Sequence, residues 1–114
     1  MKKCKITVLE TTFNEKLAKE YGVENIGRCP FHKVGQVFEA DYAKPEGFCD
    51  EAWKAIQHYV FALAHGTKGT FFSNKWIRKE GVAINSCNDG LRPVIFKIEQ
   101  ADRIVEKGEG NPHG

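Results

Sequence analysis

The sequence predicts an α+β fold, a mostly antiparallel sheet of about four strands with one long helix on one face and one short helix. Segments near both ends of the chain alternate apolar and polar residues, which is typical of half-buried strands. A long stretch between them repeats apolar residues every three or four positions, as one buried face of a helix does. The last two predicted strands are separated by the turn signal Asn88-Asp89-Gly90, which favours an antiparallel hairpin.

The first half of the chain is expected to form two strands with the short helix between them. Apolar and polar residues alternate in both strands. The short helix has Asn14 as a favourable N-cap and Gly22 just after its last turn. In chain order, the strand, helix and strand are predicted over 4–10, 15–21 and 34–41.

The long helix is expected to be capped by Asp50 and to end at Gly66. Glu51 suits the positive N-terminal end of its dipole. Its buried face is predicted to contain Ala52, Ile56, Tyr59, Val60 and Leu63, widened by Trp53, Phe61 and Ala64. A helix this apolar is expected to pack on the sheet and also to contact a second subunit.

The second half continues with an aromatic-rich connection over 67–80, whose rings should fold back on the core or lie at an interface. The hairpin strands are predicted over 81–87 and 92–100. We found no repeat and no linker, so a single domain is expected over 1–105, followed by a flexible polar tail over 106–114.

The composition is that of a soluble globular protein, with 41% hydrophobic and 28% charged residues. The chain has no apolar run long enough to span a membrane, and its first residues predict a strand rather than a signal peptide. We therefore expect a cytoplasmic protein whose thiols are kept reduced. The net charge of +2 decides little, and nucleic-acid binding is the least favoured of the functions considered. The cluster KWIRK over 75–79 is then a solvated loop with one anchoring aromatic, although Trp and three cations also suit nucleic acid.

The main candidate site consists of Cys29, His32, Cys49 and Cys87. Thiolate and imidazole are ligands that zinc and iron prefer, and four of them complete a tetrahedral site. Each lies where a predicted element begins or ends, so the four can meet in space. Cys49 and Cys87 are also the candidate catalytic thiols. For Cys49 there is a further reason, since a thiolate at a helix N-terminus is stabilised by the helix dipole. The other interpretation is that these cysteines are ordinary buried residues.

Four more residues are candidate ligand contacts. Asp89 and Arg92 form a polar patch beside Cys87, where Arg92 can hold a carboxylate through two hydrogen bonds. A plain hairpin turn explains the same residues. His58 and Trp53 lie on the long helix, where His58 can line a pocket or serve a structural role. Cys4 shares the pattern of the first strand and is predicted to be a core residue. The sequence contains no Walker loop, GxGxxG, GxSxG or HExxH motif.

Four stretches together resemble a family of small uncharacterised prokaryotic proteins of about this length: FNEKLAKEYG, CPFHKVGQVFEAD, PEGFCDEAWKAIQHYVFALAHG and CNDGLRPVIFKIE. The resemblance covers roughly residues 3–100. The family pattern has cysteines at the positions of Cys29, Cys49 and Cys87, and often a histidine at that of His32. It implies a compact single domain with a cysteine-centred site, and it brings no established activity.

Two functions are compatible with these residues. The first is a cysteine-centred protein that binds zinc or iron, or uses a reactive thiol, for small-molecule or redox chemistry. The alternative is a non-catalytic accessory subunit with buried structural cysteines. In that case the aromatics of 69–77 and the long helix form a homo-oligomer interface or a small-molecule pocket.

Overall fold

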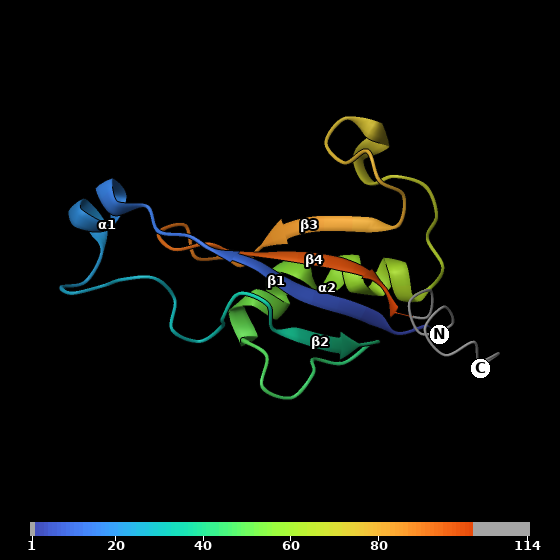
Figure 1. Cartoon of the computed structure of the whole chain (residues 1–114), viewed down its shortest axis with the longest axis horizontal. Coiled ribbons are helices and arrows are strands. Elements are labelled where there is room, and N and C mark those ends of the chain that lie inside the picture. Colours follow the sequence, from blue (N-terminus) through green and yellow to red (C-terminus); the bar gives the residue numbers. More distant parts are fainter. Residues whose placement is uncertain (1, 102–114) are drawn as a thin grey trace.

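The computed structural model describes residues 2–101, so the predicted tail and the predicted end of the domain at 105 lie outside the described residues. The elements follow the predicted order with one added 3-10 turn, η1. They are β1 (Cys4–Thr11), α1 (Glu15–Tyr21), β2 (Val37–Ala40), α2 (Asp50–Ala64), η1 (Phe71–Asn74), β3 (Val82–Ser86) and β4 (Val94–Gln100). The predicted α+β class is confirmed (Figure 1).

The four strands form one antiparallel sheet in the order β2-β1-β4-β3. The central pair joins the two ends of the described chain, with Cys4 opposite Gln100 and Thr11 opposite Val94. The predicted hairpin of β3 and β4 is present. The sheet therefore places residues just after β3 and just before β4 at one of its ends, which is also where β1 leads into α1 (Figure 1).

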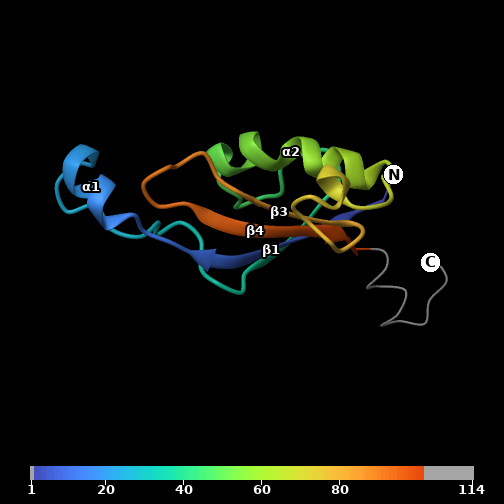
Figure 2. The same ribbon diagram turned by 90° about the horizontal axis from the view of Figure 1, so that it is seen from above.

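α2 packs on one face of the sheet, as predicted (Figure 2). Alternation brings Ile6, Phe96 and Ile98 to that face, and Ile56 and Val60 of α2 meet them in the buried core. Among the described residues, the opposite face of the sheet carries no helix (Figure 2). No helix in the described part of the chain is long and apolar enough to cross a membrane.

Several boundaries differ from the prediction. Cys49, rather than Asp50, is the N-cap of α2, and Asp50 is its first helical residue. Phe61 is 42% exposed instead of widening the buried face, because it lies on the solvent side of α2. β2 is shorter than predicted because Gly35 turns the chain with a φ of 95°. The Gly35 N–H donates to the Val8 carbonyl, but this hydrogen bond lies outside the ladder of β1 and β2. β4 starts two residues late, after Pro93, whose nitrogen cannot donate to the sheet.

α1 lies beyond the end of the sheet (Figure 1). Its N-cap is as predicted, since the Leu17 N–H donates to Oδ1 of Asn14 at 3.0 Å. Only Ala18 of this helix is buried. The Asn14 N–H donates to the Leu91 carbonyl at 2.7 Å, which attaches the helix to the turn before β4.

Candidate functional site

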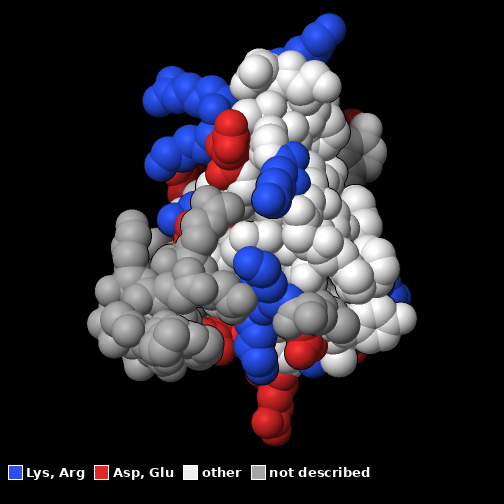
Figure 3. Space-filling model, turned by 90° about the vertical axis from the view of Figure 1, so that its right-hand side faces the viewer, with Lys and Arg blue, Asp and Glu red and all other residues white. Residues whose placement is uncertain are grey.

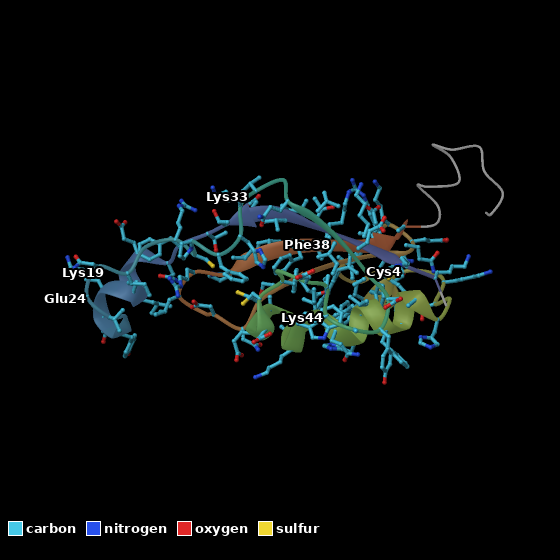
Figure 4. All side chains as sticks on the ribbon, turned by 90° about the horizontal axis from the view of Figure 1, so that it is seen from below. Cys4, Lys19, Glu24, Lys33, Phe38 and Lys44 are labelled. Atoms are coloured by element: carbon cyan, nitrogen blue, oxygen red, sulfur yellow. The ribbon has the colours of Figure 1, made fainter. Side chains whose placement is uncertain are left out.

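Cys29, Cys49 and Cys87 line one cavity of about 450 Å³. Cys29 lies in the irregular segment after α1, Cys49 is the N-cap of α2, and Cys87 directly follows β3. Figure 4 shows sulfur atoms grouped near the N-terminal end of α2, away from the labelled Cys4. The fold thus brings together three of the four residues of the predicted site, from segments far apart in the sequence.

The β3–β4 hairpin positions Cys87 through its backbone and its sulfur. The Cys87 N–H donates to the Val94 carbonyl at 3.2 Å, and the Val94 N–H donates to Sγ of Cys87 at 3.4 Å. The turn between them is organised by Asp89, whose Oδ1 accepts from the N–H groups of Leu91 and Arg92 at 2.9 and 3.2 Å. Cys87 is therefore held at a fixed place at the mouth of the hairpin.

Arg92 lines the cavity and is bound to its own turn, since its Nε donates to Oδ2 of Asp89 at 2.7 Å. That hydrogen bond raises the pKa of Arg92, and the charges of Asp89, Cys29 and Cys87 add to the effect. Partial burial acts to raise the pKa of Asp89, but its hydrogen bonds to Arg92 and to Leu91 outweigh burial and lower it. The guanidinium therefore lies within electrostatic reach of two of the three cysteines.

Asn88 connects the hairpin turn to the start of α2. Its Nδ2 donates to the carbonyl oxygen of Glu51 at 3.1 Å and to Oε1 of the same residue at 3.3 Å. Hydrogen bonds from Lys54 and Asn88 lower the pKa of Glu51. This link holds the residue after Cys87 against the first turn of α2, which directly follows Cys49.

His32 does not line the cavity. It is 3% exposed, and its Nε2 accepts a hydrogen bond from the N–H of Cys49 at 3.3 Å. Its Nδ1 lies 3.1 Å from Oε1 of Gln36, which also accepts from the Lys33 N–H, so Nδ1 carries the proton. Burial lowers the pKa of His32, while the bond to Gln36 opposes that effect. The imidazole therefore satisfies a free N–H at the start of α2 from behind the cavity.

The other candidate residues lie apart from the cavity, except Asp89 and Arg92. His58 is exposed, with its ring 4.2 Å from that of Tyr59. Trp53 is half-buried against Phe48, with ring centroids 6.1 Å apart. Cys4 is a core residue, as predicted, and its Sγ donates to the Val60 carbonyl at 3.5 Å.

Sequence reasoning missed four residues that line the cavity, namely Pro30, Phe31, Glu51 and Asn88. Each is within two positions of a cysteine in the sequence, which is the only signal that could have found them. Phe31 is the apolar wall of the cavity, and it stays half exposed.

All four cysteines are free thiols. Within residues 2–101, no group of three or more Cys, His, Asp or Glu side chains is spaced to hold a metal ion. The donor chemistry of the cavity suits a soft metal, but the three cysteine-bearing segments would have to draw closer to bind one. No family model, curated protein or solved structure matches this chain.

Proposed function

We propose that the chain binds a transition-metal ion, zinc or iron, through Cys29, Cys49 and Cys87. The observation that carries this proposal is that cysteines from three distant segments line one cavity. Thiolates are preferred ligands of both metals. Because His32 already uses both ring nitrogens in hydrogen bonds, the protein supplies three ligands and leaves the fourth position to water or to a small molecule.

The charges around the cavity support a bound cation. Three thiolates around a divalent ion carry excess negative charge, which a neighbouring cation stabilises. Arg92 is placed for that role, since it lines the same cavity as the three cysteines. Its own carboxylate partner, Asp89, keeps the guanidinium oriented.

Metal binding requires the three thiols to move closer together, and the segments that carry them are held to different degrees. Cys49 is held by α2 and by His32, and Cys87 is held by the hairpin. Cys29 lies in a segment without helix or strand between α1 and β2. We therefore expect metal binding to draw Cys29 toward the other two thiols and to order its segment.

The test is metal binding by the whole chain, prepared without oxygen and loaded with Zn²⁺ or Fe²⁺. Elemental analysis should find about one ion per chain in the parent protein. Cobalt loading should give the thiolate-to-metal absorption that indicates sulfur ligands. Alanine at Cys29, Cys49 or Cys87 should remove both signals, while circular dichroism shows the fold retained.

Cys4→Ala is the matched control because Cys4 lies in the core, away from the cavity. It should keep the metal. The proposal fails if the parent protein retains no more metal than the variant lacking all three cavity cysteines, or if Cys4→Ala loses metal equally.

The same cavity supports a second candidate, a reactive thiol at Cys49. Cys49 is the N-cap of the 15-residue α2, and no side chain caps the N–H groups of the first helical turn that follows it. Iodoacetamide should then label Cys49 of the metal-free protein faster than Cys29 or Cys87, as read by peptide mass spectrometry. Equal labelling rates would contradict this candidate.

Self-association is a candidate function of a different class. The apolar face of α2 is covered by the sheet, so the surface that supports this candidate is that of α1. Tyr21 and Val23 are 71% and 74% exposed beyond the end of the sheet. The helix surface is also self-complementary in charge, with Glu15, Lys16, Lys19 and Glu20. Light scattering should show a dimer whose mass falls to that of a monomer in Tyr21→Ser/Val23→Ser. A parent protein that is monomeric at all concentrations would exclude it.

A further inference from the structure

The segment between α2 and β3 carries a concentration of positive charge that the net charge conceals. Residues 65–81 contain four cations, Lys68, Lys75, Arg78 and Lys79, and one carboxylate, Glu80. All four are exposed, and none forms a salt bridge with another described residue. Figure 3 shows Lys and Arg side chains projecting from the upper part of the molecule, where this segment lies in Figure 1.

The same segment presents an aromatic pair to solvent. Trp76, which sequence analysis expected to anchor the loop, is instead 72% exposed. Its ring lies over that of Phe72, with centroids 4.0 Å apart and planes 31° apart. Phe72 in turn approaches Tyr59 of α2 at 6.3 Å. The exposed indole of Trp76 therefore packs on Phe72, which is near Tyr59 at the edge of the core.

The backbone holds this pair in an unfavourable conformation. Phe72, Ser73 and Asn74 all have left-handed φ values, of 60°, 52° and 66°. Left-handed backbone is strained for a non-glycine residue, and such strain is often found at functional sites. The Gly81 N–H donates to the Gly69 carbonyl at 3.0 Å, which closes the base of the loop.

Between this loop and the uncovered face of the sheet lies a groove of about 400 Å³. Trp76, Arg78 and Lys79 line one side of it, and Ile84 and Lys97 of the hairpin line the other. Lys97 is paired with Glu99, the one carboxylate in the groove, at 3.4 Å. The groove thus has an aromatic wall, an apolar floor and cations along its rim.

We propose that this groove binds single-stranded nucleic acid, with a base stacked on Trp76 and the phosphates next to Lys75, Arg78 and Lys79. An exposed ring stacks on any base, and unpaired cations neutralise a phosphate backbone. A concave groove that places the aromatic in its wall favours a strand over a flat lipid surface. The proposal is independent of the cysteine cavity, since the two sets of lining residues do not overlap.

Fluorescence anisotropy with labelled oligothymidylate and oligouridylate tests the proposal at low and increasing salt. Trp76→Ala should weaken binding about tenfold, and Trp76→Phe should recover most of the affinity. Binding should also quench tryptophan fluorescence in the parent protein but not in Trp76→Ala, where only the half-buried Trp53 remains.

The charge contribution is tested with Arg78→Gln/Lys79→Gln. The slope of log affinity against log salt should fall in magnitude by about 1.4 when two phosphate contacts are removed. The control Lys16→Gln/Lys19→Gln removes two exposed charges from α1 and should leave the slope unchanged. Metal content should not change in any of these variants.

Three results would overturn the proposal. The first is no salt-sensitive binding of either single strand at low salt. The second is equal weakening by the α1 control, which would indicate attraction by net charge alone. The third is binding to vesicles of phosphatidylcholine and phosphatidylserine without binding to oligonucleotide, which would assign the surface to a membrane.

Discussion

His32 shows how strongly the role of one residue depends on its neighbours. Its spacing from Cys29 is compatible with a metal ligand, and its residue type is compatible with several roles. In the fold it lies among phenylalanine rings and accepts a hydrogen bond from the backbone of Cys49. It therefore acts on the candidate site through the position of Cys49.

Replacing His32 tests that role. His32→Leu keeps the volume but leaves the Cys49 N–H and the Gln36 side chain without their partner, so the free energy of unfolding should fall by about 1–3 kcal/mol. Urea unfolding measures the change. His58→Leu is the control on an exposed histidine of α2, and it should stay within about 0.5 kcal/mol. Equal effects of the two changes would contradict the assigned role.

His32 also predicts a pH dependence of stability. Its pKa in the folded protein is lowered from the ordinary value of 6.5, mainly by burial. Below pH 6.5 the unfolded chain binds a proton that the folded chain resists, so stability should fall as the pH decreases through that range. Urea unfolding between about pH 7.5 and 5 follows the loss. His32→Leu should flatten this part of the profile, and an unchanged profile would exclude His32 as its source.

At the scale of elements, the N-terminus of α2 and the β3–β4 hairpin build most of the cavity. The hairpin places Cys87 and Arg92 at one end of the sheet, and Asn88 attaches that turn to α2. These two elements are packed against the core. Cys29 also packs against the core, but its segment contains no helix or strand, so we expect it to be the adjustable part of the site.

α1 ends where a side chain at position 22 would collide with the helix. A Cβ on Gly22 would lie 2.7 Å from the Ala18 carbonyl oxygen and 2.9 Å from Cγ2 of Ile26. Gly22→Ala should therefore cost α1 about 1–3 kcal/mol of local stability, seen as faster amide exchange by NMR. Gly27→Ala is the control, because a Cβ there meets nothing within 4 Å. Similar exchange in both variants would show that the last turn of α1 relaxes without cost.

At the scale of the whole molecule, stability is distributed unevenly. The core lies between α2 and the two central strands, whereas α1 contributes one buried residue. Hydrogen exchange should therefore be slowest in β1 and β4 and much faster in α1, as measured by mass spectrometry of peptides. Protection of α1 equal to that of β1 would show that the exposed face of α1 is covered in solution, as self-association requires.

Local patterning in the sequence was sufficient to predict the fold class, the order of the elements and the hairpin. Alternation assigned β1 and β4, and the three-to-four spacing assigned α2, because both periods follow directly from backbone geometry. Patterning misplaced the ends of β2 and β4, where Gly35 and Pro93 interrupt the ladder. Patterning also predicted that Phe61 is buried, because a stripe of apolar residues does not show how much of the helix the sheet covers.

The sequence by itself determined the candidate residues, namely three cysteines, an arginine and a cluster of cations with a tryptophan. Only the tertiary structure decided how these residues are grouped. The packing of α2 on the sheet brings Cys49 and Cys87 to one cavity. The fold also buries His32, which accepts a hydrogen bond from the Cys49 N–H, and the loop before β3 exposes Trp76. The physical reason is that side-chain neighbourhoods arise from contacts between segments far apart in the chain, which no local pattern records.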